Sequence, residues 1–299
     1  MRGKSLVFNN TPISGRSLIY GLIGDPVDHS LSPTIQNAAF QSAGLDAVYV
    51  AWRVQPLGLR SAVQGLRVLG VRGFNVTTPH KSAVARYLDK VDILASRIQS
   101  VNTVTNERGR LTGFSTDGAG ALNSLEEAGA SLDQGGIILI GAGGAGRAIA
   151  YVLAERGCKF TFVNRTLSKA RLIARRIRDQ FNIQVASAPL SSRNLKTLLA
   201  QAEIVINASS MGMNGKSNLP IKPAWLRPEH YVFDLVYRPL ETKLLQYASL
   251  AGARTITGLD MLVNQGACSF FLWTGRKAPV VEMRQAIGLR LPMVGSPAG

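Results

Sequence analysis

The chain has 299 residues, of which 46% are hydrophobic, and a formal net charge of +16. This length exceeds one typical hydrophobic core, so the sequence predicts two domains, and its composition excludes a disordered chain. Lys and Arg are spread along the sequence without a nucleic-acid reader motif, and no apolar run is long enough to span a bilayer. We therefore expect neither nucleic acid nor a membrane as a partner.

The cysteine and histidine content bounds the chemistry further. Cys158 and Cys268 form no disulfide framework and no Cys-x-x-Cys motif, and the three histidines are scattered, so the sequence predicts no metal site and a location in the cytoplasm. Residues 1–16 and 294–299 are expected to lack regular structure. The sequence does not distinguish a monomer from a homodimer.

The first 115 residues alternate between strand and helix patterns. Strands are predicted at 17–24, 47–54 and 73–77, and helices at 33–44 and 57–69. This alternation indicates an α/β fold with a mostly parallel sheet that is covered on both faces. A pair of helices follows, and two further strands, 100–104 and 111–115, are predicted to form a hairpin.

Two serines precede the first helix. Ser32 stands directly before Pro33, which is typical of an N-cap followed by proline at the first helical position. Ser30 has no such capping role. Two hydroxyl groups at a helix N-terminus also suit a bound carboxylate, and the sequence leaves these two interpretations open.

A lysine and an aspartate are the candidates for acid–base chemistry. Lys81 is expected in the first turn of the helix after strand 73–77, where the positive end of the helix dipole disfavours a cation. This placement favours a proton donor or acceptor over a surface lysine. Asp117 begins a later helix, either as its N-cap or as a carboxylate that pairs with Lys81.

A strand, a glycine loop and a helix follow one another in the centre of the chain. The apolar run 137–140 leads into Gly141, Gly143 and Gly146, and an Ala-rich helical run covers 147–156. Glycines at this spacing allow a tight turn, the approach of a pyrophosphate and close packing of helix on strand. The sequence therefore predicts a Rossmann-type, doubly wound dinucleotide-binding domain.

The residues after the next strand, 159–163, predict which dinucleotide binds. An NAD site has an acidic residue there for the ribose 2′-hydroxyl, but this chain has Asn164, Arg165 and Thr166, with Lys169 beyond. These groups would hold a 2′-phosphate, which favours NADP. Thr166 is also a plausible N-cap. Three more strands are expected, at 203–207, 231–236 and 254–257, and a long helix from Gly258 to Trp273.

Taken together, the loops resemble those of the shikimate dehydrogenase family. The resemblance rests on Ser30-Leu31-Ser32-Pro33, Asn75-Val76-Thr77-x-Pro79-x-Lys81, Val101-Asn102-Thr103, Thr116-Asp117-Gly118, the glycine loop, Asn164-Arg165-Thr166, Asp234-x-x-Tyr237-x-Pro239 and Gln265-Gly266. It extends over residues 17 to 290. The family reduces 3-dehydroshikimate to shikimate with NADPH in aromatic amino acid biosynthesis.

The resemblance implies a role for each matching residue. Lys81 and Asp117 would be the catalytic pair. The small-molecule substrate would be bound by Ser30, Ser32, Thr77, Asn102, Asp117, Tyr237 and Gln265. NADP would be bound by Gly141, Ala142, Gly143, Gly144, Ala145, Asn164, Arg165, Thr166, Leu167, Ser168, Lys169, Leu235 and Gly258. The substrate domain would be discontinuous (1–116 and 259–299), and the NADP domain would be 117–258.

Three small departures from the family pattern leave the core chemistry intact and bear only on substrate preference. Ser100, Ser115 and Ile93 replace residues that are usual in the family and would tune the substrate preference toward quinate. The alternative is therefore a dual-specificity quinate/shikimate dehydrogenase that uses NAD or NADP. A non-catalytic sensor on the same scaffold is disfavoured because both Lys81 and Asp117 are present.

Overall fold

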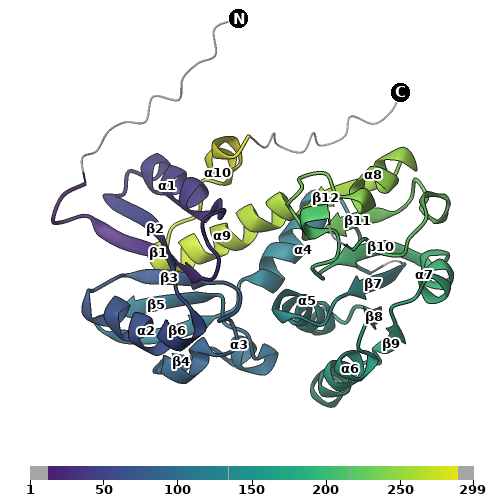
Figure 1. Ribbon diagram of the computed structural model, residues 1–299, viewed down its shortest axis with the longest axis horizontal. Helices are drawn as coiled ribbons and strands as arrows, with labels where there is room; N and C mark the ends of the chain where they lie inside the picture. The colour runs from purple at the N-terminus through teal and green to yellow at the C-terminus, as the bar shows by residue number, and fades with distance from the viewer. Residues whose placement is uncertain (1–12, 134, 216, 289–299) are drawn as a thin grey trace, which may run out of the picture. The chain divides into compact units, whose positions relative to one another are not determined.

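The computed structural model describes residues 13–133, 135–215 and 217–288, and it divides into two compact α/β units (Figure 1). One unit contains the described residues up to Ser96, the segment Val101–Phe114 and the described residues from Gly266 onward. The other contains Arg97–Ser100 and Ser115–Gln265. The tail 294–299 and most of segment 1–16, both expected to be irregular, lie outside the described residues. Within the described ranges, every helix is too short or too polar to cross a bilayer.

The first unit is built on a six-stranded mixed sheet in the order β2-β1-β3-β5-β6-β4. The strands are β1 (Leu18–Gly24), β2 (Ala47–Arg53), β3 (Gly73–Val76), β4 (Lys90–Val91), β5 (Thr103–Glu107) and β6 (Arg110–Phe114). Strands β2, β1 and β3 are parallel, whereas β5 runs antiparallel to both β3 and β6. The predicted hairpin is confirmed, and the sheet is parallel in only part of its width.

Helices cover both faces of this sheet. They are α1 (Ser32–Ser42), α2 (Leu59–Val68), α3 (Ile93–Ile98) and the second half of α9 (Gly258–Thr274), while α10 (Val280–Ala286) packs against α1. On one face, Val63 of α2 packs with Phe74 and Val104 of the sheet. On the other face, the ring of Tyr20 on β1 stacks against Phe40 of α1 and Trp273 of α9.

The chain after β3 differs from the expected pair of helices. Residues 81–83 form a turn that leads into a 3-10 helix, Val84–Tyr87, so only the second helix of the expected pair, α3, is an α-helix. Strand β4 then pairs with β6, and Asp89 accepts a hydrogen bond from the Leu111 N–H at 2.6 Å. These contacts with the sheet edge override the local helix preference. Lys81 is therefore not in the first turn of an α-helix, and the helix-dipole argument for it was wrong.

The second unit is built on a six-stranded parallel sheet in the order β12-β11-β10-β7-β8-β9. The strands are β7 (Gly136–Ile140), β8 (Phe160–Asn164), β9 (Ala186–Pro189), β10 (Ala202–Asn207), β11 (Tyr231–Asp234) and β12 (Arg254–Thr257). Counted within the unit, this order is 3-2-1-4-5-6 read from the β9 edge, the doubly wound dinucleotide-binding order. The predicted Rossmann-type fold is confirmed, with β9 as a strand that the sequence did not predict.

Helices α4 to α8 and the first half of α9 belong to this unit. Apart from α9, they are α4 (Asp117–Glu127), α5 (Gly144–Glu155), α6 (Leu167–Phe181), α7 (Ser192–Leu199) and α8 (Lys243–Leu250). Helices α7 and α8 pack on one face of the sheet, where Leu195 and Leu245 join Ile138 and Val205 in the core. Helices α5 and α6 lie on the opposite face (Figure 1).

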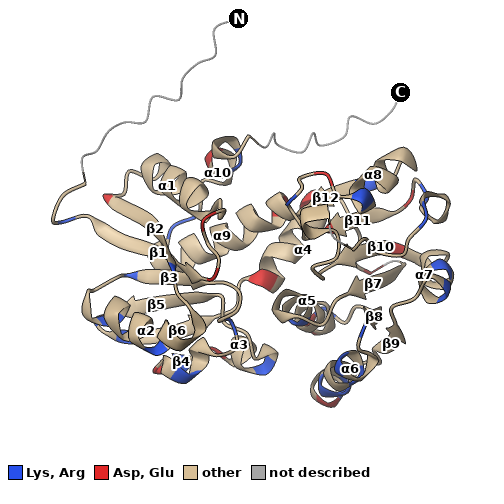
Figure 2. Ribbon diagram, in the orientation of Figure 1, with Lys and Arg blue, Asp and Glu red and all other residues tan. Residues whose placement is uncertain are grey.

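Helix α6 carries a marked concentration of positive charge (Figure 2). Arg171, Arg175 and Arg178 are exposed, whereas Ile173 and Ile177 on the opposite side of the helix are buried. Arg175 and Arg178 both lie within 4 Å of Asp179. The basic stripe is the solvent-facing side of an amphipathic helix.

Candidate active site

Three of the expected substrate-side residues meet at the carboxyl end of β3. The N–H of Val76 donates to the carbonyl of Asn102 at 2.9 Å, and the N–H of Val101 donates to the carbonyl of Lys81 at 2.8 Å. These bonds hold the loop that carries Thr77 and Lys81 against the segment that carries Asn102. Thr77 and Lys81 are half-buried, and Asn102 is buried.

The two serines before α1 have different local roles. The helix begins at Ser32 itself, so the prediction that Ser32 is the N-cap was wrong. Instead, the hydroxyl oxygen of Ser30 accepts the N–H of Ser32 at 3.2 Å and satisfies one of the free N–H groups at the start of the helix. The Ser32 side chain is buried.

Asp117 and Gln265 project from two helices of the second unit that touch. Asp117 is the first residue of α4 and is 3% exposed, while the N-cap position belongs to Thr116. One turn later, a Cβ on Gly120 would lie 2.5 Å from the backbone nitrogen of Gln265 on α9. Because the two helices approach this closely, the Cα atoms of Asp117 and Gln265 lie in the same region of the unit.

The glycine loop has the geometry that the spacing predicts. Gly141 has φ +107°, and a Cβ on Gly146 would lie 1.9 Å from the carbonyl oxygen of Gly141. Only glycine allows α5 to pack this closely on the end of β7. Gly143 is exposed, and a Cβ added there would meet no atom within 4 Å. Space for a phosphate therefore lies beside the N-terminus of α5, where N–H groups and the helix dipole favour an anion.

The turn between β8 and α6 joins this loop through Asn164. The Asn164 side chain accepts the N–H of Ala142 at 3.2 Å and donates to the carbonyl of Thr166 at 2.9 Å. Thr166 occupies the N-cap position of α6, but its side chain makes no capping hydrogen bond. Of the other expected cofactor residues here, Arg165, Ser168 and Lys169 are exposed and Leu167 is half-buried.

The expected nicotinamide-end residues also lie together. A Cβ on Gly258, at the start of α9, would lie 2.3 Å from the carbonyl oxygen of Leu235. Tyr237 follows two residues later and is half-buried, and burial raises the pKa of its phenol while nearby Arg238 lowers it. The loop after β11 and the start of α9 thus form one surface of the second unit.

Comparison with known proteins decides which family this arrangement belongs to. Sequence models of the shikimate dehydrogenase substrate binding domain, of shikimate/quinate 5-dehydrogenase and of the shikimate 5′-dehydrogenase C-terminal domain match residues 22–104, 123–218 and 258–287. The shikimate dehydrogenase (NADP(+)) of Moorella thermoacetica is 45% identical over 276 residues, 90% of this chain and 94% of that protein. The chain belongs to the shikimate dehydrogenase family.

Solved structures of shikimate dehydrogenases share the fold along the chain. One in complex with NADP+ has a TM-score of 0.85 and 40% identity, and covers 92% of this chain and 96% of its own. The enzyme of Thermus thermophilus in complex with NADP(H) and shikimate has a TM-score of 0.81 and 37% identity, and covers 90% and 98%. The resemblance to shikimate dehydrogenases is therefore confirmed.

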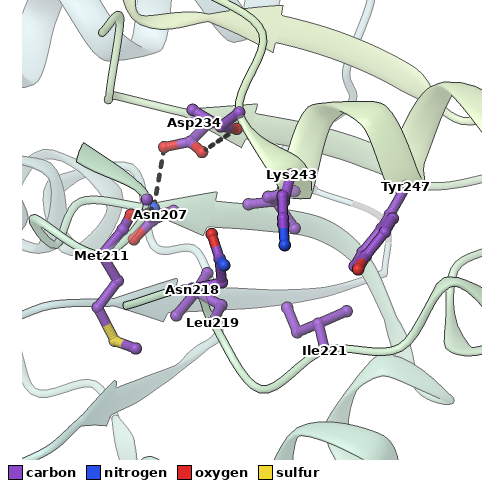
Figure 3. A pocket seen from close by; sticks show the side chains of 11 residues that line it. Asn207, Met211, Asn218, Leu219, Ile221, Asp234, Lys243 and Tyr247 are labelled. Atoms are coloured by element: carbon purple, nitrogen blue, oxygen red, sulfur yellow. Dashed lines mark hydrogen bonds between the residues drawn. The ribbon is translucent and has the colours of Figure 1, made fainter. Parts of the chain in front are cut away.

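This shikimate dehydrogenase family member also contains a buried polar cluster to which sequence reasoning assigned no role (Figure 3). The carboxylate of Asp234 accepts three hydrogen bonds, from the Asn207 amide at 2.9 Å, the Thr242 hydroxyl at 2.7 Å and the N–H of Val236 at 3.0 Å. The side-chain oxygen of Asn207 accepts the Ser209 hydroxyl at 2.6 Å. The cluster joins the loops that follow β10 and β11. Polar residues at the ends of two adjacent apolar strands were the signal that could have revealed it.

Replacing Asp234 by Ala is expected to lower the free energy of unfolding by about 3 kcal/mol. Each buried donor that loses its acceptor costs about 1–3 kcal/mol, and water molecules that enter the space left by the carboxylate offset part of this cost. Urea unfolding followed by circular dichroism measures the change. An Asp234→Ala variant as stable as the unmodified protein would contradict the role of this cluster.

Asp234→Asn is the matched control for the charge. Its oxygen can still accept from Asn207 and Val236, and the Thr242 hydroxyl can turn to accept from the new amide, so the loss should be smaller than for Ala. Burial raises the pKa of the Asp234 carboxyl, so the folded state binds a proton at this carboxyl more tightly than the unfolded chain does. The free energy of unfolding therefore falls as the pH rises above the pKa of an unfolded aspartate. Because Asn lacks this loss, the stability gap between Asp234→Asn and the unmodified protein should narrow from pH 3 to pH 7.

Proposed function

We propose that this protein catalyses the reversible, NADPH-dependent reduction of 3-dehydroshikimate to shikimate. The observation that carries the proposal is the 45% identity, over 90% of the chain, to a protein named shikimate dehydrogenase (NADP(+)). The reaction belongs to aromatic amino acid biosynthesis. The alternative, a dual-specificity quinate/shikimate dehydrogenase, is not favoured by these relatives.

The first unit is proposed to bind the substrate. Its hydroxyl and amide groups at the carboxyl ends of β1 and β3 suit a hydroxylated ring with a carboxylate, and ligands of open α/β sheets bind at this end. Ser30 and Ser32 would hold the carboxylate, and Thr77 and Asn102 would hold the ring hydroxyls. Asp117, Tyr237 and Gln265 of the second unit would complete the substrate contacts.

Lys81 and Asp117 are proposed to be the catalytic pair. During reduction the carbonyl oxygen gains negative charge, and an ammonium group beside it stabilises that charge and supplies a proton. The Lys81 amine is the proposed donor at this oxygen, and the Asp117 carboxylate would keep the amine oriented. In the direction of oxidation the same amine takes the hydroxyl proton back.

The second unit is proposed to bind NADP, whose nicotinamide supplies the hydride. The open space at Gly143 and the N-terminus of α5 fit its pyrophosphate. The exposed groups of Arg165, Thr166 and Lys169 fit a 2′-phosphate, and the surface at Leu235 and Gly258 fits the nicotinamide end. The pyrophosphate would also contact Gly141, Ala142, Gly144 and Ala145.

Replacing Arg165 by Ala is expected to lower kcat/KM for NADPH about 10- to 100-fold, the effect of losing a charge-assisted hydrogen bond of roughly 1.5–3 kcal/mol. The kcat/KM for NADH should change little, because NADH has no 2′-phosphate. Initial rates with both cofactors measure the two values. Arg171→Ala, which removes an exposed arginine one turn into α6, is the control and should affect neither cofactor.

A spectrophotometric assay at 340 nm tests the function itself. The purified protein is given shikimate or quinate, each with NADP+ or NAD+. We expect rapid turnover only with shikimate and NADP+. Comparable rates with quinate or NAD+ would establish the dual-specificity alternative, and no turnover in any combination would contradict the proposal.

The two units are proposed to be the substrate domain and the NADP domain, with predicted boundaries at 116/117 and 258/259. The two compact units of the structure instead meet at 114/115 and at 265/266, and the second of these boundaries lies inside α9. A cytoplasmic location, a monomeric or homodimeric state and the absence of a nucleic-acid partner remain predictions.

A further inference from the structure

A buried asparagine fastens α9 to α4 in the second unit. Asn264 on α9 is 2% exposed, and its amide nitrogen donates to the hydroxyl of Ser124 at 3.0 Å and to the carboxylate of Glu127 at 2.9 Å. Both acceptors lie on α4, and Ser124 is also 2% exposed. The proposed reaction gives none of these three residues a role.

The hydrogen-bond partners fix the direction of each bond. The Ser124 hydroxyl donates to the carbonyl of Gly120 at 2.8 Å, and a carbonyl can only accept. The Ser124 oxygen is therefore left as the acceptor for Asn264. An ionised carboxylate also only accepts, so the second N–H of Asn264 is committed to Glu127 in a charge-assisted bond. The amide of Asn264 consequently has one orientation.

This network lies beside the closest approach of the two helices. A Cβ on Gly120 would lie 2.5 Å from the backbone nitrogen of Gln265, the residue that follows Asn264. Asp117, Gly120 and Ser124 are spaced so that they share one face of α4, and this face meets α9. Asn264 thus holds the helix that carries Gln265 against the α4 face that includes Asp117.

Packing at a glycine leaves part of this arrangement undetermined. Gly120 offers α9 no side chain to interlock with, so close packing fixes the distance between the helices better than their rotation or register. We propose that Asn264 is a positioning residue that fixes the rotation and register of α9 on α4, and thereby the spacing between Asp117 and Gln265. These two residues are proposed substrate contacts, so an error in their spacing weakens their hydrogen bonds to the ring. This inference rests on the proposed function, because it takes shikimate as the ligand.

The test exchanges donor and acceptor across the contact in the purified full chain. Asn264→Asp places a second carboxylate beside Glu127, and the like charges repel. We expect KM for shikimate to rise about threefold to tenfold, the effect of weakening one neutral hydrogen bond to the substrate, with KM for NADP+ nearly unchanged. Glu127→Gln alone should change neither constant, because its amide oxygen still accepts from Asn264. In the double variant the new amide donates to the new carboxylate, and KM for shikimate should return to the unmodified value.

Asn264→Leu tests whether the rescue depends on this pair of groups. Leu is similar in size and removes both donors without adding a charge, so KM for shikimate should rise here as well. Adding Glu127→Gln should bring no recovery, because Leu offers the new amide no acceptor. If Asn264→Asp fails to fold, this variant still tests the role.

Ser191→Ala is the control for a general loss of stability. It removes the hydroxyl that accepts the N–H of Asn194 at the start of α7, a helix of the same unit with no part in this network. Loss of this N-cap destabilises the unit. KM for shikimate should nevertheless stay unchanged.

The outcomes separate this role from the proposed function. No turnover of shikimate by the unmodified protein would overturn the proposed function, and the role would fall with it. If the unmodified protein is active, the positioning role is overturned by an unchanged KM for shikimate in both Asn264 variants. It is also overturned if Glu127→Gln does not rescue Asn264→Asp, if it rescues Asn264→Leu equally, or if Ser191→Ala reproduces the rise in KM.

Discussion

Replacing Lys81 by Met should lower kcat for shikimate oxidation about 10²- to 10⁴-fold, the range expected when a general acid–base group is removed. Met keeps the length and apolar stem of the side chain, so the half-buried position remains filled. KM for shikimate should change only modestly, because the amine is proposed to act mainly as charge develops on the reacting oxygen. Steady-state kinetics with NADP+ measure both constants.

Lys90→Met is the matched control for this change. Lys90 lies on β4 of the same unit and is exposed, so the same substitution should leave kcat unchanged. A Lys81→Met enzyme with undiminished kcat would remove Lys81 from the mechanism. A large rise in KM at constant kcat would instead assign the lysine to substrate binding.

Replacing Gly146 by Ala should both destabilise the second unit and impair cofactor binding. The added Cβ would lie 1.9 Å from the carbonyl oxygen of Gly141, and this atom belongs to backbone that cannot rotate away. Helix α5 would have to move off the end of β7, and forced repacking of this kind costs about 1–3 kcal/mol. Because the N-terminus of α5 moves with the helix, KM for NADPH should rise at least about tenfold. Thermal unfolding and initial rates measure the two effects.

Gly143→Ala separates the two effects because its Cβ meets no protein atom within 4 Å. This variant should keep the stability of the unmodified protein but should still raise KM for NADPH, because the methyl group occupies the space proposed for the pyrophosphate. Equal stability losses in the two variants would contradict the steric argument for Gly146. An unchanged KM for NADPH in Gly143→Ala would place the pyrophosphate elsewhere.

The cofactor unit could be predicted well where the signal is local. An apolar run, three glycines and an Ala-rich helix follow one another within about twenty residues, and the structure has β7, the loop and α5 there. Strand β9 was missed because Ala186-Ser187-Ala188-Pro189 has no β-branched or aromatic residue, and proline is tolerated only because this strand forms the edge of the sheet. Strand β4, with two residues, forms only through its contact with β6.

The candidate site shows the same difference between local and distant signals. The sequence could identify Lys81, Asp117 and the serines from their neighbours along the chain. It could not assign a role to Asn75, a buried residue on β3 whose side-chain hydrogen-bond partners are 26 to 194 positions away along the chain. It also placed the N-cap of α1 at Ser32, because a serine before proline does not reveal that the N–H of Ser32 is bonded to Ser30.

The double attachment of Asn164 has a practical consequence for redesign of cofactor preference. One side chain braces both the glycine loop and the start of the β8–α6 turn, so an exchange of the whole Asn164-Arg165-Thr166 triplet would disturb the part of the pocket common to both dinucleotides. An engineer who wants an NADH-dependent variant should keep the amide and alter only its exposed neighbours. Selectivity and basal affinity can then be tuned separately.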